Sequence, residues 1–457
     1  MKRLLLLGLL PAVGWLLAGC RPAPSNQATA PAPVQNASAP DALSLVLASH
    51  QGEGKVDREI TRLQNEVRQA TDPGPWLERL GWMFVAKARQ SFDPGFYKLA
   101  EQCAVALESR QPGVSHEALL LRGHVLHNLH RFKEAEPLAA RLVAERGLAF
   151  DFGLLSDLLM EQGRLDEAAE ACQKMIDLKP SLHSYARAAH LRWLKGDLTG
   201  AVEVMQLAVG AGSPQDGEST AWVNTRLASY LFQSGEENAA RRAVENALSY
   251  QTDYAPALLL RGRMKLSEGR ADEAVASLQR ALELNPLPEY QWVLAEALHA
   301  AGRDPEASVI EQQLARSGAA NDPRTYSLYL ATHRQSPETA VRLAEGELKE
   351  RADVFTHDAL AWSLATANRL DDAWPHLARA LAEGTQDARL FFHATVMHAQ
   401  AGHPEEAARF FERANALRHL LLPSENRRLQ LAARAPGKKF ADDNLTTGPA
   451  ALTKTGE

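Results

Sequence analysis

This chain of 457 residues has few cysteines, no excess of basic residues and few long apolar runs, and each of these features excludes a class of protein. Three cysteines are too few for a fold that depends on a framework of disulfide bonds. The 50 Lys and Arg residues are outnumbered by 56 Asp and Glu residues, so the formal charge is −6 and the basic face of a nucleic-acid-binding protein is missing. After the first twenty residues, no run is long and apolar enough to cross a bilayer.

Sequence motifs of the common enzyme classes are also missing. The chain has no G-x-S-x-G elbow, no phosphate-binding P-loop, no H-E-x-x-H motif and no G-x-G-x-x-G motif. We therefore predict that the protein is not an enzyme and that it uses no cofactor.

The first twenty residues have the pattern of an export signal. Lys2 and Arg3 precede an apolar run from Leu4 to Leu17, and the run ends in Leu-Ala-Gly-Cys. This ending resembles the signal of bacterial lipoproteins, which implies cleavage before Cys20 and acylation of that cysteine. The alternative is an ordinary signal peptide in which the cysteine is incidental.

Residues 20–40 read as a tether that follows a signal peptide over residues 1–19. The stretch from Arg21 to Pro40 holds five prolines, no aromatic residue and one charge, so it cannot build a core. In the enterobacterial lipoproteins that the N-terminus resembles, Asp after the acylated cysteine causes retention in the inner membrane. Arg21 stands there instead, so the resemblance implies a lipid-anchored protein that faces the periplasm, preferably from the outer membrane.

Variants of one six-residue phrase, such as GRLDEA at residues 163–168 and GRADEA at residues 269–274, occur nine times at a nearly constant spacing. Each copy ends in alanine, and successive alanines are 33 or 34 residues apart except for one step of 39. These alanines are Ala135, Ala168, Ala201, Ala240, Ala274, Ala307, Ala340, Ala373 and Ala407. A looser tenth copy ends at Ala100. Periods of this length indicate stacked structural repeats.

Each period contains two helical segments that the phrase separates. In residues 150–162 apolar residues recur at intervals of three and four, which indicates an amphipathic helix. Gly163 ends that helix, and Asp166 and Glu167 suit the start of the next one. A helix–turn–helix period of about 34 residues resembles the tetratricopeptide repeat (TPR). We therefore predict an all-α, right-handed TPR solenoid of about ten repeats over residues 72–420, in which the two helices of a repeat touch at the phrase alanine.

Two places depart from the regular period. The step of 39 residues places an insertion at residues 210–219, which we expect to protrude as a polar loop. The eighth repeat has Leu328 where the other repeats have a small residue, and its turn at Gln335 lacks glycine. We expect a local distortion there.

Capping segments are predicted at both ends, because a solenoid needs a polar cover over its terminal repeats. Residues 41–71 supply the first, with a helix from about Val56 to Ala70. Residues 421–434 supply the second, with Ser424 as the residue that caps its helix. The tail of residues 435–457 has little to bury and is predicted to be disordered.

The two remaining cysteines fall on the second helices of repeats one and three. Cys103 and Cys172 are therefore two repeats apart, beyond the roughly 7 Å between Cα atoms that a disulfide allows. We predict that both are small buried residues and that neither is reactive.

In TPR solenoids the first helix of each pair lines the concave groove, at repeat positions of about 2, 5, 9 and 12. With the phrase alanine set at position 20, this register selects a set of candidate contact residues. They are Leu120, His124, His127, Asp157, Met160, His190, Trp193, Trp222, Ser229, Phe232, Trp292, Glu296, His299, Asp358, Trp362, Phe392 and the adjacent His393. Aromatic anchors among isolated charges are typical of a groove that binds a peptide or a helix. The alternative is that the tryptophans bridge neighbouring repeats as core. The Lys and Asn pattern with which chaperone-binding relatives hold a carboxylate is missing, so a C-terminal carboxylate ligand is not predicted.

Histidines near residue 124 offer a weak metal hypothesis. His124 and His127 are three residues apart on one helix, and Asp157 and Glu161 are expected to face them from the next repeat. Two imidazoles and a carboxylate suit Zn²⁺ or Cu²⁺. The alternative is a pair of ordinary histidines with no metal, and we predict no metal site.

Several phrases between residues 180 and 420 resemble a group of exported bacterial TPR proteins. They are Ser184–Val209, Thr220–Val223, Pro286–Tyr290, His357–Leu364 and Glu383–Ala394. The group has no assigned biochemical activity, so the resemblance implies a fold and not a function. Asp358, Trp362 and His393 fall in its most characteristic phrases and are the preferred contact residues. The alternative is that these three form a structural junction between repeats nine and ten.

The sequence favours a membrane-anchored scaffold that binds a segment of a partner protein in its concave groove, in the assembly of the cell envelope. The alternative is a periplasmic TPR protein that binds a small ligand or a metal.

Overall fold

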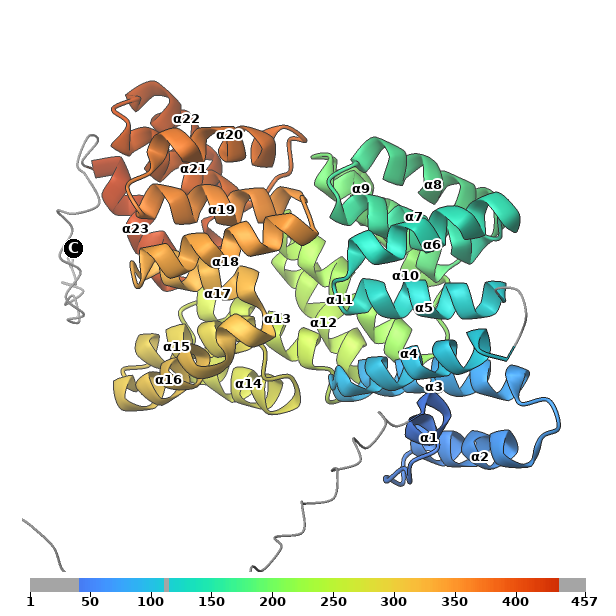
Figure 1. The fold of residues 1–457 in the computed structure, drawn as a ribbon. Helices are drawn as coiled ribbons and strands as arrows, with labels where there is room; N and C mark the ends of the chain where they lie inside the picture. Colours follow the sequence, from blue (N-terminus) through green and yellow to red (C-terminus); the bar gives the residue numbers. More distant parts are fainter. Residues whose placement is uncertain (1–40, 111–114, 435–457) are drawn as a thin grey trace, which may run out of the picture. The chain divides into compact units, whose positions relative to one another are not determined.

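The computed structural model describes residues 41–110 and 115–434, and within these ranges the chain is helical and has no strand (Figure 1). Twenty of the helices form ten consecutive pairs. The pairs are α3 (Gly74–Ser91) with α4 (Gly95–Glu108), α5 (His116–Asn128) with α6 (Phe132–Glu145), α7 (Ala149–Glu161) with α8 (Leu165–Leu178), α9 (Leu182–Leu194) with α10 (Leu198–Gly210), α11 (Gly217–Gln233) with α12 (Glu237–Tyr250), α13 (Ala255–Ser267) with α14 (Ala271–Leu284), α15 (Pro288–Ala300) with α16 (Asp304–Asn321), α17 (Pro323–Thr332) with α18 (Pro337–Glu350), α19 (Val354–Thr366) with α20 (Leu370–Leu381), and α21 (Ala388–Gln400) with α22 (Pro404–Ala416). None of the described helices is long and apolar enough to cross a membrane.

The phrase alanines lie where the two helices of a pair meet. Every one of them is on the second helix of its pair, and nine of the ten have no exposed surface; Ala407 in the last pair is 7% exposed. A methyl group is the largest side chain that allows such a close approach of two helices. The prediction of a helix–turn–helix solenoid with small residues at this contact is confirmed.

Turns between paired helices use left-handed backbone. Gly163 and Gly196, after α7 and α9, have φ angles of 73° and 83°. At both glycines a Cβ atom would also clash with the main chain of a distant segment, at Ala352 and Gly384. Here glycine serves both the turn and a close contact that the local sequence does not reveal.

The eighth pair shows the expected distortion. Its first helix, α17, has 10 residues, whereas most first helices have 13. In the turn that follows, Arg334 and Ser336 have φ angles of 57° and 44°, which non-glycine residues rarely adopt. A helix that is shorter by about one turn and a strained connection therefore replace the usual glycine turn.

The insertion before the fifth pair mostly extends a helix, whereas a protruding polar loop was predicted. It does not form a ten-residue polar loop, because α11 begins at Gly217 and has 17 residues. Asp216 caps this extended helix by accepting a hydrogen bond from the backbone of Ser219. Glu218 in the added turn pairs with Arg89 of α3. The extra residues thus lengthen a helix and anchor it to the first repeat, and only residues 211–216 remain as a loop.

Helices outside the pairs lie at both ends of the described chain. Two precede the first pair, α1 (Ala42–Val46) and α2 (Lys55–Gln69), and α2 buries Ile60, Leu63 and Val67 against it. A 3₁₀ turn, η1 (Arg418–Leu420), and a final helix, α23 (Pro423–Arg434), follow the last pair. The predictions made for residues 1–40 and 435–457 fall outside the described residues.

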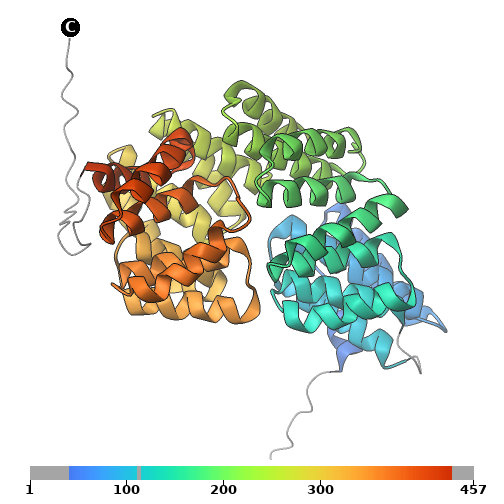
Figure 2. The ribbon, with the colours of Figure 1, turned by 90° about the horizontal axis from the view of Figure 1, so that it is seen from above.

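The stack of pairs curls until distant repeats touch. Figure 2 shows the segments near residues 150–200 facing those near residues 350–390. The backbone N–H of Ala352 donates to the carbonyl of Glu161 at 3.0 Å, and the side chain of Gln162 donates to the carbonyl of Glu350 at 3.0 Å. One repeat further along, Lys195 forms an ion pair with Glu383 at 3.0 Å. These contacts bring the inner faces of early and late repeats toward one another.

Both cysteines are buried and free, as predicted. Cys103 has no exposed surface, and Cys172 is 2% exposed. Burial raises the pKa of the Cys103 thiol well above its ordinary value and that of Cys172 to about 11. Neither side chain is in a position or a protonation state that supports thiol chemistry.

Candidate functional site

The predicted contact residues Asp358, Trp362 and His393 come together, but below the surface. Both carboxylate oxygens of Asp358 lie 2.9 Å from Nδ1 of His393, and the Trp362 and His393 rings stack with centroids 4.3 Å apart. Their exposed fractions are 2%, 0% and 0% in chain order. The cluster joins α19 to α21, which is the structural junction that the sequence left as the alternative.

Trp292 and Glu296 of α15 are covered as well, at 1% and 6% exposure. The indole Nε1 of Trp292 donates to Glu296 at 3.2 Å. The backbone N–H of Ser424 donates to the other oxygen of this carboxylate at 3.1 Å, and the Ser424 hydroxyl donates to the first. Ser424 therefore binds a distant helix. It does not serve as the predicted cap of its own helix, because that helix begins one residue earlier, at Pro423.

The cover is the chain's own C-terminal segment, Arg418–Arg434, which lies across the first helices of the late repeats. His419 contacts the carbonyl of Phe232 on α11 at 2.7 Å, and Arg428 donates to the carbonyl of Thr332 on α17. The guanidinium of Arg428 also lies 4.8 Å from the centroid of the Trp362 ring. The inner face from α15 to α21 is thus already occupied by a peptide segment, in the way that a TPR groove holds a ligand.

In the early repeats, the inner face carries a half-buried ion pair. Arg187 of α9 holds Asp157 of α7 with two hydrogen bonds, at 2.8 and 2.6 Å. Burial opposes ionisation of Asp157, but the Arg187 guanidinium outweighs it and keeps the pKa of this carboxyl below its ordinary value. Asp157 is therefore ionised and bound to Arg187.

His124 and His127 lie beside this pair without forming a metal site. Burial, together with His127, lowers the pKa of His124 to about 3, and burial also lowers the pKa of His127. The carboxylate that was expected to complete the site, Asp157, is bound to Arg187. Within residues 41–110 and 115–434, no group of three or more His, Cys, Asp or Glu side chains is placed to hold a metal ion.

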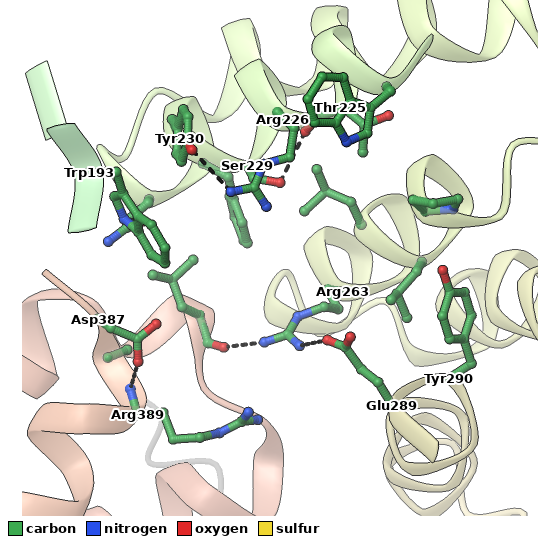
Figure 3. Close-up of a pocket in the computed structure, with 18 residues that line it drawn as sticks. Trp193, Thr225, Arg226, Ser229, Tyr230, Arg263, Glu289, Tyr290, Asp387 and Arg389 are labelled. Atoms are coloured by element: carbon green, nitrogen blue, oxygen red, sulfur yellow. Dashed lines mark hydrogen bonds and ion pairs between the residues drawn. The ribbon is translucent and has the colours of Figure 1, made fainter. Parts of the chain in front are cut away.

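A cavity of about 440 Å³ opens on the inner face between these two regions (Figure 3). Its walls come from α9, α11, α13 and α15, from the start of α21, and from Leu420 of the C-terminal segment. Trp193 and Trp222 form much of the apolar wall, and both are half-buried. This volume is in the range of ligand-binding pockets.

Trp193 is held in place by its neighbours. Its ring stacks on His190 of the same helix at 5.3 Å and on Phe355 of α19 at 5.6 Å, and its Nε1 donates to Gln233 of α11 at 2.8 Å. Three elements therefore fix the ring, which also lines the cavity. A rigid aromatic surface of this kind binds an apolar side chain at little cost in conformational entropy.

Three arginines also face the cavity: Arg226 of α11, Arg263 of α13 and Arg389 of α21. They were not among the predicted contact residues. The register that selected the aromatic residues also passes through Arg263 and Arg389, so a complete use of it would have found them. Arg226 lies one position beyond the register, and no signal in the sequence singles it out.

The comparison with family models supports the repeat assignment. The model of the tetratricopeptide repeat matches residues 120–183, 155–216, 225–287 and 262–323. These four matches span α5 to α16 and leave the junction of α19 and α21 outside. The comparison with curated proteins gives no match.

Solved structures with similar chains are distant. The crystal structure of MamA is 21% identical, covers 35% of this chain and 92% of its own, and superposes with a TM-score of 0.29. The crystal structure of the APC/C hetero-tetramer Cut9–Hcn1 is 13% identical over 85% of this chain and 98% of its own, with a TM-score of 0.36. At these TM-scores the superpositions carry no argument about the site.

Proposed function

Since this chain is a solenoid of tetratricopeptide repeats, which generally mediate protein–protein interaction, we propose that it is a membrane-anchored scaffold that binds a segment of a partner protein on its concave face. The binding site is the cavity walled by α9, α11, α13, α15 and the start of α21. One observation carries the proposal: this stretch of the inner face has an aromatic wall and open volume, whereas the stretch from α15 to α21 is filled by the chain's own C-terminal segment.

The C-terminal segment also supports the kind of ligand proposed. It crosses the inner face as a short helix and contacts it through a cation–π contact, main-chain carbonyls and an ion pair, so this surface has the chemistry to hold a peptide. Four of the contact residues predicted from the sequence line the open cavity: Trp193, Trp222, Ser229 and Phe232. His190 lies behind the wall, against Trp193 and Arg226. Trp292, Glu296, Asp358, Trp362 and His393 are buried, and a partner does not reach them in this arrangement.

Photo-crosslinking combined with a tryptophan substitution tests the site. A photoreactive amino acid at Ser229, which lines the cavity, is expected to capture a partner in the native host, and Trp222→Ala is expected to abolish the capture. The matched control is Trp374→Ala, because Trp374 is a half-buried tryptophan on the outer helix α20, where it contacts His398 at 4.9 Å. A photoreactive residue at the exposed Val309 of α16 reports non-specific capture. Equal capture at both positions, or capture at Ser229 that survives Trp222→Ala, contradicts the proposal.

The membrane anchor is proposed from the sequence alone, because Cys20 lies outside the described residues. Acylated Cys20 would hold the protein at the envelope with the solenoid in the periplasm, and the preferred location is the outer membrane. Several acyl chains on one residue make such anchoring stable. We expect Cys20→Ala to shift the protein from the membrane fraction to the soluble periplasmic fraction and to remove the acyl mass from its N-terminal peptide. A wild-type N-terminal peptide without acyl mass would favour the ordinary signal peptide instead.

A further inference from the structure

The three arginines at the cavity differ in what they bind. Nε of Arg389 donates to Glu425 of the C-terminal segment at 2.6 Å. Nη2 of Arg263 donates to the carbonyl of Leu420 in the same segment at 2.9 Å, and its Nη1 lies 3.3 Å from Glu289. Two of the three guanidinium groups are therefore bound by the peptide segment that the inner face already holds.

The third arginine, Arg226, has neutral partners. Its Nη2 lies 2.9 Å from Nδ1 of His190 and 3.0 Å from the hydroxyl of Tyr230, and the guanidinium lies over the Tyr230 ring at 5.2 Å (Figure 3). Burial and the nearby Arg226 charge lower the pKa of His190 to about 3, so the imidazole is neutral and accepts the hydrogen bond. Among the residues that the structure describes, no carboxylate lies within ion-pair distance of Arg226.

The two acidic residues of the cavity wall, Asp387 and Glu289, already have other partners. Oδ1 of Asp387 accepts hydrogen bonds from the backbone N–H groups of Arg389 and Leu390, at 2.8 and 3.1 Å, and so caps α21. Glu289 is paired with Arg263. The half-buried cation of Arg226 therefore meets no counter-charge from the cavity wall, although hydrogen bonds to a charged partner are the strong ones in such a site.

We propose that the cavity recognises an acidic residue, Glu or Asp, within the partner's segment, and that Arg226 binds its carboxylate while Trp193 and Trp222 bind an apolar side chain next to it. This inference rests on the proposed function and names the chemistry of the ligand. The C-terminal segment supplies the precedent, because Glu425 is bound by Arg389 from the middle of a chain that continues to Arg434. The acidic group is for that reason a side chain and not a chain terminus.

A random-peptide selection on the full-length protein tests the inference. Displayed 12-residue peptides with blocked ends are selected on wild-type protein, and the most enriched one is synthesised. We expect the selected peptides to share Glu or Asp beside an aromatic or aliphatic residue. Arg226→Gln is expected to weaken binding of the synthetic peptide by about 10- to 100-fold, since it removes one charge-assisted contact. Arg261→Gln is the control, because Arg261 is half-buried on α13 and donates to Ser277, away from the cavity.

A change in the peptide makes the test independent of any effect of Arg226→Gln on folding. Replacing the shared Glu or Asp by Gln or Asn is expected to cause a similar loss on wild-type protein and little further loss on the Arg226→Gln variant. Peptides that need Trp222 but neither an acidic residue nor Arg226 would overturn the carboxylate site and leave the groove function standing. If no peptide is enriched, or if binding survives Trp222→Ala, the proposed function is overturned along with it.

Discussion

Trp362→Ala is expected to lower the free energy of unfolding by about 3–5 kcal/mol, the usual loss for a buried tryptophan. The ring has no exposed surface and stacks on His393, and Phe392 contacts it edge-on at 5.2 Å. Its Nε1 donates to Thr332 of α17 at 3.1 Å. The substitution therefore leaves a cavity among α17, α19 and α21 and removes contacts that these first helices share.

Chemical denaturation followed by circular dichroism measures this loss, with Trp222→Ala as the control. Trp222 is half-buried at the cavity wall, so its removal is expected to cost much less stability than removal of Trp362. The comparison also affects how binding data are interpreted. If Trp362→Ala abolishes capture of a partner, lost stability of the late repeats explains it. A Trp362→Ala protein as stable as wild type that no longer binds would restore Trp362 as a contact residue.

The fold could be predicted because its signals are local and repeat. Within one period the chain places a turn residue, an acidic first turn and a small residue at fixed distances. This pattern recurs in ten periods. The ten described pairs and their buried alanines follow from it. Even the strained eighth turn could be predicted, because a missing glycine is visible in the sequence, and Arg334 and Ser336 take up the left-handed backbone.

The candidate site could be predicted only in part, because a register shows which side of a helix faces inward but not what covers that side. Asp358, Trp362 and His393 do lie on first helices, as the register requires, or directly beside the register position. Whether such residues are exposed depends on contacts with segments far along the chain. Ser424 reaches Glu296 across 128 positions, and Gln162 reaches Glu350 across 188. No periodic pattern encodes pairs of that separation.

The same reason explains what the sequence did not reveal about the last helix. Residues 421–434 have the composition of a capping helix, and a cap is the ordinary fate of a helix after the last repeat. The helix does pack on α21. Two of its four charged residues, however, are buried toward the inner face, where Glu425 has no exposed surface and Arg428 is 7% exposed. Burial of charges in a short polar helix is a sign of specific partners, and here the partners are Arg389 and the carbonyls that end α17.

Glu425→Ala is expected to be about as destabilising as Trp362→Ala, at about 3–5 kcal/mol, because it breaks a buried ion pair from one side. The carboxylate of Glu425 binds Arg389 at 2.6 Å and also accepts the backbone N–H of Leu422 at 2.8 Å. Without it, Arg389 keeps a charge in a confined site over the Trp292 ring, at 4.9 Å. The segment loses its ion pair with α21 at the same time, and hydrogen exchange of α23 and η1 is expected to rise well above that of α13.

A double substitution separates the cost of an unpaired charge from the value of the pair. Replacing both Arg389 and Glu425 by methionine fills the space with apolar groups and leaves no charge behind, and such exchanges are often neutral. We expect the double variant to recover most of the stability that Glu425→Ala loses. Recovery would show that the segment is held by packing and shape, with the ion pair fixing its register on the inner face. If the double variant is as unstable as Glu425→Ala, the ion pair itself holds the segment in the groove. The arginines at the cavity would then be the main determinants of what this surface binds. Arg226 would bind the carboxylate of an external ligand in the same way.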